Sequence, residues 1–247
     1  MEITKFNIAV LIDGDNAQPR LLKAILEEVS KYGKATIRRI YGDWTTQQMN
    51  GWKEIINQYS INPVQKFSYT TGKNSTDSSL IIEAMDILHG KNIDGFCIVS
   101  SDSDYTGLAK RIREEGLFVM GIGEKKTPSA FVQSCEIFTF CENIVSEIET
   151  NIESEKQKNS QPKKVKTPSK VNNADLSIID KAFDISTNEE DQAFIATIGL
   201  NLRKIDPSFD PRTYGFKNLT SLFKSIKKYL VEKNVVNGLN QPLVKLR

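Results

Sequence analysis

The sequence predicts an α/β protein, with a parallel sheet flanked by helices and a small, mostly α-helical C-terminal domain of winged-helix type. Short apolar runs alternate with helical patterns as far as about residue 145, which is typical of a parallel sheet. A polar, lysine-rich stretch then interrupts the pattern, and mainly helical periodicity follows it. The predicted boundaries are 1–148 for the α/β domain, 149–174 for a flexible basic linker and 175–247 for the second domain.

Each predicted strand of the first domain is a short apolar run. The run 95–99 is uninterrupted and rich in β-branched residues, so we expect it to be buried on both faces of the sheet, and the run 7–12 is expected to form a second apolar strand. Further strands are predicted at 35–41, 62–67, 117–122 and 137–140. Apolar residues at three- and four-residue spacing predict helices at 19–32, 47–59, 77–88, 108–115 and 129–134.

The second domain is predicted to contain three helices and a terminal β-wing. The helices are expected at 176–183, 191–202 and from 219 to about 230. We expect the second helix to bury Phe194, and the third to bury an apolar stripe that runs to Leu230. The linker before this domain has little apolar content and no periodicity, so it is predicted to be flexible. Its lysines fit either a solubilising tether or a nonspecific contact with nucleic acid.

Charge is divided unevenly along the 247 residues, although the net charge is only +2. Residues 1–150 carry 16 Lys and Arg against 20 Asp and Glu, residues 151–174 carry 6 against 2, and residues 175–247 carry 11 against 9. An acidic first domain followed by basic segments suits an acidic site combined with binding of a polyanion.

Composition excludes several classes of protein. The chain has one histidine and three cysteines without a CxxC pair, too few for a zinc site or a histidine-based triad. We interpret Cys97, Cys135 and Cys141 as reduced thiols and predict a cytoplasmic protein. No apolar run reaches the roughly 18 residues of a membrane span, and the first residues do not resemble a signal peptide, so we expect no membrane partner.

Four acidic residues lie at the ends of predicted elements. Asp13 follows the strand 7–12, Asp102 and Asp104 follow the strand 95–99, and Asp77 begins a helix that is entered from a polar loop. Because the carboxyl ends of parallel strands meet at one edge of a sheet, we expect the four side chains to converge. Clustered carboxylates favour a hard cation such as Mg²⁺ or Mn²⁺, which could assist transfer of a phosphoryl group.

Each acid also has an ordinary structural interpretation. The strand-end aspartates could cap the helices that follow them, and Asp77 could complement a helix dipole. Strand-end aspartates also serve phosphatases that act on small molecules. Lys73 lies four residues before Asp77, and it is either a contact to the scissile phosphate or an exposed loop lysine.

Three motifs together resemble the NYN domain, in its LabA-like bacterial branch, over about residues 5–145. The motifs are Leu11-Ile12-Asp13-Gly14-Asp15-Asn16, Lys73-x-x-x-Asp77 and Val99-Ser100-Ser101-Asp102-Ser103-Asp104. The resemblance implies a PIN-like fold and a Mg²⁺- or Mn²⁺-dependent ribonuclease. It would make Asp13, Asp77, Asp102 and Asp104 the catalytic, metal-binding cluster, with Asn16 and Ser101 nearby at the substrate.

The stretch YGFKNLTSLF at 214–223 resembles the OST-HTH, or LOTUS, domain over about residues 175–247. The resemblance implies RNA or protein partners. Lys217, Lys224 and Lys228 fall along one side of the predicted third helix, as expected either of a phosphate-contacting patch or of an ordinary solvated face.

We therefore predict a cytoplasmic, metal-dependent ribonuclease that hydrolyses phosphodiester bonds of single-stranded RNA and carries a C-terminal RNA-binding module. The main alternative is a catalytically silent adaptor that binds RNA or protein and keeps the acids for folding or metal binding. A small-molecule phosphatase is the second alternative.

Overall fold

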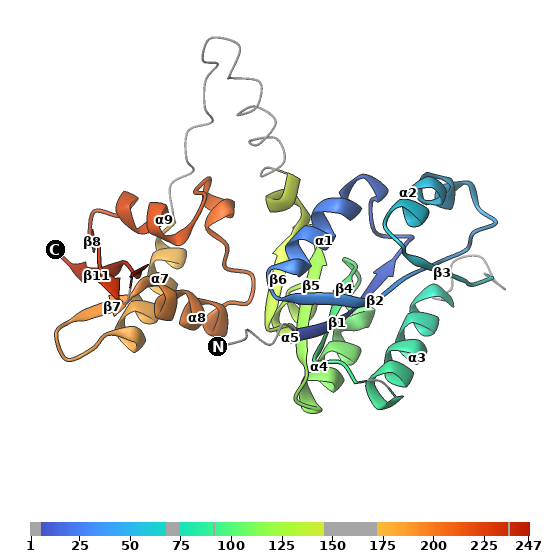
Figure 1. Cartoon of the computed structure of the whole chain (residues 1–247), viewed down its shortest axis with the longest axis horizontal. Helices are drawn as coiled ribbons and strands as arrows, with labels where there is room; N and C mark the ends of the chain where they lie inside the picture. The colour runs from blue at the N-terminus through green and yellow to red at the C-terminus, as the bar shows by residue number, and fades with distance from the viewer. Residues whose placement is uncertain (1–5, 68–74, 91, 146–171, 237) are drawn as a thin grey trace, which may run out of the picture. The chain divides into compact units, whose positions relative to one another are not determined.

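The computed structural model describes residues 6–67, 75–90, 92–145, 172–236 and 238–247. The chain divides into two compact units, Met1–Ile148 and Glu149–Arg247 (Figure 1). Each unit has its own hydrophobic core. Among the described residues, no helix is both long enough and apolar enough to cross a membrane.

A parallel sheet forms the centre of the N-terminal unit, with its strands in the order β3-β2-β1-β4-β5-β6 (Figure 1). The strands are β1 (Phe6–Asp13), β2 (Gly33–Gly42), β3 (Asn62–Gln65), β4 (Gly95–Val99), β5 (Phe118–Gly123) and β6 (Ile137–Phe140). The chain winds outward from β1 to β3, returns to the centre at β4, and then winds the other way to β6. The carboxyl ends of β1 and β4 are therefore neighbours at the point where the winding reverses, which is where open α/β sheets form crevices.

Helices cover both faces of this sheet, which confirms the predicted α/β fold (Figure 1). One face is covered by η1 (Pro19–Leu21), α1 (Leu22–Ser30), η2 (Gln47–Trp52) and α2 (Lys53–Gln58). The other face is covered by α3 (Ser75–Gly90), η3 (Ser103–Tyr105), α4 (Thr106–Glu114) and α5 (Ser129–Ser134).

Alternation along β1 explains why two cores form. Ile8, Val10 and Ile12 point to the α1 face, whereas Ala9 and Leu11 point to the α3 and α4 face. All five side chains are buried, so β1 is covered on both faces.

The C-terminal unit combines helices with a small antiparallel sheet, as predicted for a winged-helix type of domain. Its helices are α7 (Asn173–Ser186), α8 (Ile195–Ile205), η4 (Pro211–Tyr214) and α9 (Leu219–Ser225). Its strands are β7 (Gln192–Phe194), β8 (Tyr229–Glu232), β9 (Val235–Val236), β10 (Leu239–Asn240) and β11 (Leu243–Leu246). β7, β11 and β8 form one sheet, and β9 pairs with β10. Phe183, Ile198 and Phe223 contribute to the core between the helices.

The second predicted helix of this unit starts later than expected. Residues 192–194 form β7, and α8 begins only at Ile195. Ala193 is buried opposite Val244 of β11, so the next side chain, Phe194, turns outward and is 37% exposed. The expectation that Phe194 is buried was therefore wrong.

The third predicted helix is shorter than its apolar pattern suggested. α9 ends at Ser225 because Ile226 takes an extended backbone conformation, and Tyr229 then starts β8. Leu230 pairs with Lys245 of β11 and is 36% exposed. Of the apolar stripe after residue 225, Ile226 therefore lies at the helix end and Leu230 in a strand, although their spacing imitates a helical stripe.

Candidate metal centre

The strand register places Asp13 and Ser100 side by side at the carboxyl edge of the sheet. Ile12 of β1 pairs with Val99 of β4, so the residues that follow them are level with each other. In both strands the side chain two positions earlier faces α3 and α4, so Asp13 and Ser100 point to that side as well. The Ser100 hydroxyl donates a hydrogen bond to Asp13 Oδ2 at 2.9 Å.

Asp13 is fully buried, and donors surround its carboxylate. Asn16 Nδ2 donates to Oδ2 at 2.7 Å, and the backbone N–H of Asp15 donates to Oδ1 at 3.2 Å. The pKa of Asp13 is raised by burial and by the negative charges of Asp77 and Asp15, against the hydrogen bonds from Asn16 and Ser100, which lower it. Asp13 is thus a buried carboxyl whose orientation is fixed by its neighbours.

The other three predicted acids form a close group at the same edge. One carboxylate oxygen from each of Asp77, Asp102 and Asp104 lies within 4.8 Å of the others. Asp77 comes from the first turn of α3, whereas Asp102 caps η3 and accepts the backbone N–H of Asp104 at 3.0 Å. Asp104 is exposed, so this carboxylate group, defined as Asp77, Asp102 and Asp104, opens to solvent.

Ser100 links Asp13 to the carboxylate group. Its hydroxyl donates to Asp13 and at the same time accepts the backbone N–H of Asp102 at 3.1 Å. The four acids that the sequence singled out therefore converge, three as a group and Asp13 beside them through one serine.

Tyr105 forms a hydrogen bond with Asp77. Its hydroxyl donates to Asp77 Oδ1 at 2.6 Å. Burial raises the pKa of Asp77, the Tyr105 hydrogen bond lowers it, and the charges of Asp102, Asp104 and Asp15 raise it further. The pKa of Tyr105 is raised by its own burial and by the carboxylates of Asp13 and Asp77, so its hydroxyl stays protonated.

The chemistry of the carboxylate group fits a hard divalent cation. All its ligand atoms are carboxylate oxygens, which suit Mg²⁺ or Mn²⁺, whereas zinc sites usually include histidine nitrogen or cysteine sulfur. The repulsion that raises the pKa of Asp77 is what a bound cation would remove.

Two glycines allow the loops at this edge to approach closely. A Cβ on Gly123, at the end of β5, would lie 2.5 Å from the carbonyl oxygen of Ser100. A Cβ on Gly14 would lie 2.7 Å from the carbonyl oxygen of Tyr41. A side chain at either position would displace the segments that carry the acids.

The predicted substrate residues of the first domain have different surroundings. Asn16 is bonded to Asp13, and the Ser101 hydroxyl accepts the backbone N–H of Glu124 at 2.8 Å. Ser101 therefore connects the turn after β4 to the loop after β5. Lys73 lies outside the described residues.

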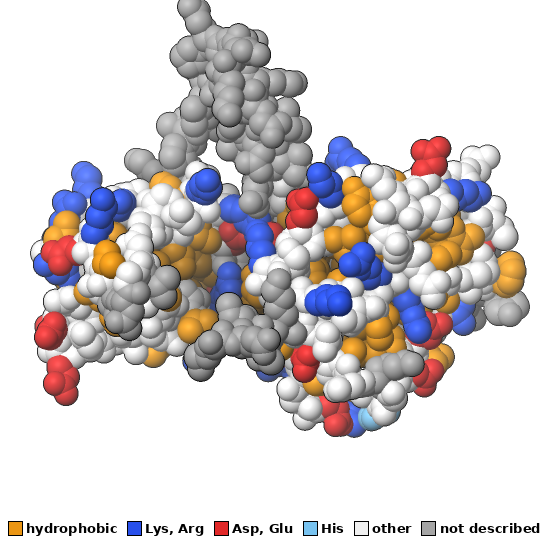
Figure 2. All heavy atoms as spheres, in the orientation of Figure 1, with side chains coloured by type: hydrophobic (Ala, Val, Ile, Leu, Met, Phe, Trp, Pro, Cys, Tyr) orange, Lys and Arg blue, Asp and Glu red, His pale blue; other side chains and the backbone are white. Residues whose placement is uncertain are grey.

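The three predicted lysines of the C-terminal unit do not share one helical face. Lys217 precedes α9, Lys224 lies in its last turn, and Lys228 follows it, because the helix ends at Ser225. All three are exposed, and Figure 2 shows several Lys and Arg side chains on the visible face of this unit. Lys228 forms an ion pair with Asp180, with 2.7 Å between Nζ and Oδ2.

Sequence reasoning did not single out Ser100 and Tyr105. Ser100 lies inside the motif at residues 99–104, and the alternation of side chains along β4 would have placed its side chain beside Asp13. Tyr105 directly follows Asp104, but nothing in the sequence showed that its hydroxyl reaches a residue 28 positions away.

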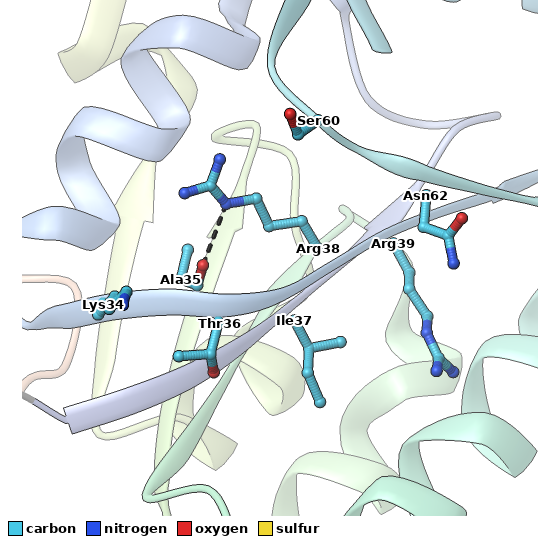
Figure 3. A pocket seen from close by; sticks show the side chains of 8 residues that line it. All are labelled: Lys34, Ala35, Thr36, Ile37, Arg38, Arg39, Ser60 and Asn62. Carbon is cyan, nitrogen blue, oxygen red and sulfur yellow. Dashed lines mark hydrogen bonds between the residues drawn. The ribbon is translucent and has the colours of Figure 1, made fainter. Parts of the chain in front are cut away.

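A cavity of about 580 Å³ lies beside the first half of β2, away from the acids (Figure 3). β3 pairs with residues 39–42, so no strand among the described residues pairs with the earlier part of β2 on that side. Arg38 covers this edge by donating from Nε to the Ala35 carbonyl at 3.1 Å, the dashed line in Figure 3, and from its guanidinium to the Tyr59 carbonyl at 3.0 Å. We interpret the cavity as the protected edge of a sheet with a short outer strand.

Comparison with known proteins assigns a family to each of the two units. The family model of the NYN domain matches residues 7–149, and the model of the OST-HTH/LOTUS domain matches residues 170–240. A search of curated proteins found no match.

Two solved structures are similar to parts of the chain. VPA0982 from Vibrio parahaemolyticus, a protein of unknown function, is 16% identical, with 58% of this chain and 98% of that chain covered and a TM-score of 0.49. An uncharacterised protein from locus NE0665 of Nitrosomonas europaea is 24% identical, with 37% of this chain and 90% of that chain covered and a TM-score of 0.30. On the family match, which spans more than half of its residues, the chain belongs to the NYN domain family, and an OST-HTH/LOTUS domain follows its NYN domain.

Proposed function

We propose that this protein is a Mg²⁺- or Mn²⁺-dependent ribonuclease that hydrolyses phosphodiester bonds of single-stranded RNA. The observation that carries the proposal is the carboxylate group, with oxygens of Asp77, Asp102 and Asp104 within 4.8 Å of one another. The group lies in an NYN domain of PIN-like α/β fold, at the carboxyl edge where β1 and β4 are neighbours.

In this proposal Asp77, Asp102 and Asp104 hold the cation. When bound, such an ion neutralises charge on the phosphate and lowers the pKa of a water molecule. Hydrolysis adds water across one phosphorus–oxygen bond, leaving a phosphomonoester on one fragment and a hydroxyl on the other. The exposed position of Asp104 leaves the group accessible to a chain as large as RNA.

Asp13 supports the same site from a buried position. The donors Asn16 and Ser100 fix its carboxylate, and the charge of Asp77 acts on it. We propose that Asp13 adds the fourth negative charge that favours a divalent over a monovalent cation. Asn16 then contributes by orienting Asp13, and Ser101 by holding the loop at Glu124.

RNA is proposed to bind through basic residues on both sides of the linker. Lys73 is the candidate contact to the scissile phosphate in the NYN domain. In the OST-HTH/LOTUS domain, the exposed Lys217 and Lys224 are better candidates than Lys228, which pairs with Asp180. A tethered second binding module raises the local concentration of substrate.

We also propose that the protein works in a reducing compartment such as the cytoplasm. Cys97, Cys135 and Cys141 are free thiols, and the first two are buried. Burial raises the pKa of the Cys135 thiol to about 12, so it behaves as a structural apolar group.

The decisive experiment measures cleavage of single-stranded RNA in Mn²⁺ by the wild-type protein and by Asp102→Asn. Asp86→Asn is the matched control, because Asp86 is an exposed aspartate on α3 outside the carboxylate group. We expect Asp102→Asn to abolish cleavage and Asp86→Asn to leave it unchanged. Equal cleavage by all three proteins would identify a contaminant and overturn the proposal.

The alternatives give different results in the same assay. A catalytically silent adaptor binds RNA without cleaving it, in wild type and variants alike. A small-molecule phosphatase hydrolyses phosphomonoesters, and its activity is indifferent to removal of residues 175–247. An adaptor whose partner is a protein neither binds nor cleaves RNA.

A further inference from the structure

Tyr105 connects the two segments that supply the carboxylate group. Asp102 and Asp104 lie at η3, and Tyr105 is the last residue of that turn, whereas Asp77 comes from α3. The hydrogen bond from the Tyr105 hydroxyl to Asp77 Oδ1, at 2.6 Å, therefore links η3 to α3 across 28 residues.

The ring of Tyr105 is itself held firmly. The side chain is fully buried in the core between the sheet, α3 and α4, and its ring centroid lies 6.3 Å from that of Phe131 on α5. A buried ring of this kind has few alternative rotamers, so its hydroxyl is a fixed donor. At neutral pH a tyrosine hydroxyl is protonated and always has a proton to donate.

This arrangement constrains how Asp77 presents its carboxylate. A carboxylate can rotate about its side-chain bonds unless a neighbouring group holds it. Tyr105 occupies Oδ1 from the buried side. The carboxylate therefore stays near Asp102 and Asp104 even though three negative charges repel one another.

We propose that Tyr105 is a positioning residue that orients Asp77 for cation binding and so sets the affinity of the carboxylate group for a divalent metal. The inference rests on the proposed function only in the identity of the cation, and it concerns binding rather than cleavage. Residues that orient metal ligands typically change metal affinity by about 10- to 100-fold when they are replaced.

The test is Mn²⁺ binding by the full-length chain, measured by calorimetry and by the electron paramagnetic resonance of free Mn²⁺. We expect Tyr105→Phe to weaken Mn²⁺ binding by about 10- to 100-fold. Tyr41→Phe is the matched control: Tyr41 is a buried tyrosine of the same core, and its hydroxyl donates to Glu83 at 3.0 Å. It should bind Mn²⁺ as wild type does.

A double-mutant cycle separates positioning from a general loss of packing. In the Asp77→Asn background, adding Tyr105→Phe should cause no further loss, because the carboxylate that Tyr105 orients is gone. An equal loss in both backgrounds would overturn the proposal, as would unchanged binding by Tyr105→Phe.

The outcome is distinguishable from failure of the proposed function. A wild-type protein that binds no Mn²⁺ would overturn both. A protein that binds Mn²⁺ through Tyr105 and Asp77 but leaves RNA intact would overturn the nuclease alone and support the role of Tyr105.

Discussion

Replacing Asp77 with asparagine should stabilise the metal-free NYN domain. The substitution keeps the size of the side chain and the oxygen that accepts the Tyr105 hydroxyl, but it removes one of three neighbouring negative charges. Asp77 has a raised pKa because of burial and because of the charges of Asp102, Asp104 and Asp15, so its ionised form is unfavourable in the folded protein.

The size of the effect follows from the spacing of the charges. Two unit charges separated by 4.8 Å repel by about 0.9 kcal/mol in water and by about 3.5 kcal/mol at an effective dielectric constant of about 20. Since the group opens to solvent, we take about 1–1.5 kcal/mol for each of the two pairs that Asp77 makes. The variant loses about 0.5 kcal/mol of favourable interaction between the Asp77 charge and the dipole of α3. It loses about 1 kcal/mol more because the hydrogen bond from Tyr105 is weaker to an amide oxygen than to a carboxylate. The net gain is then about 1 kcal/mol, or about 2–4 °C in Tm.

Tryptophan fluorescence measures this change in the right domain, because both tryptophans, Trp44 and Trp52, lie in the N-terminal unit. In EDTA at neutral pH, Asp77→Asn should unfold at a higher temperature than wild type. Mn²⁺ should reverse this order, because a ligand at about 100 times its Kd stabilises the wild type by about 2.7 kcal/mol and the variant much less. A variant that is less stable in EDTA, or equally stabilised by Mn²⁺, would refute the reasoning.

The sign of the pH dependence gives a second check on the same variant. A carboxyl whose pKa is raised by folding destabilises the protein above that pKa and ceases to do so once it is protonated. The advantage of Asp77→Asn in EDTA should therefore be largest at neutral pH. It should shrink as the pH falls through the raised pKa of Asp77 towards its ordinary value of 3.8.

Three further predictions follow from single contacts. Ser100→Ala removes a hydrogen bond to buried Asp13 and should lower the free energy of unfolding by about 1.5–3 kcal/mol, as read from denaturant titration; an unchanged midpoint would contradict it. Lys224→Glu should weaken RNA binding and its salt dependence more than Lys228→Glu, measured by fluorescence anisotropy; the reverse order would contradict the assignment. Burial raises the pKa of Asp180, but hydrogen bonds, first that from Lys228, lower it overall. Wild type should therefore have a higher Tm than Asp180→Asn at neutral pH, and circular dichroism should show this difference disappearing as the pH falls below 3.8. A difference in Tm that persists in acid would refute this.

The convergence of the acids was predictable because it depends on strand ends. The apolar runs of β1 and β4, in a chain where strands alternate with helices, predicted parallel strands, and the residues after such strands meet at one edge. Asp13 and Asp102 follow directly from that rule. The place of Asp77 at the start of α3 followed from the periodicity of the helix.

The finer arrangement was not predictable because it depends on side-chain contacts between distant segments. Ser100 links Asp13 to the turn that carries Asp102, and Tyr105 links that turn to Asp77, and no pattern in the sequence encodes those hydrogen bonds. In the C-terminal unit, apolar residues spaced three and four apart suggested a helix as far as Leu230. Pairing of β8 with β11 outweighed that local pattern, and it placed Lys228 beside Asp180.

The most direct test of the central claim compares two titrations of the wild-type protein. The rate of cleavage of single-stranded RNA is measured against Mn²⁺ concentration, and Mn²⁺ binding is measured by calorimetry under the same conditions. If the carboxylate group is the active site, the two midpoints coincide, and Asp102→Asn loses both the binding and the cleavage. Cleavage that continues in Asp102→Asn, or that needs Mn²⁺ at concentrations unrelated to binding, would contradict the account.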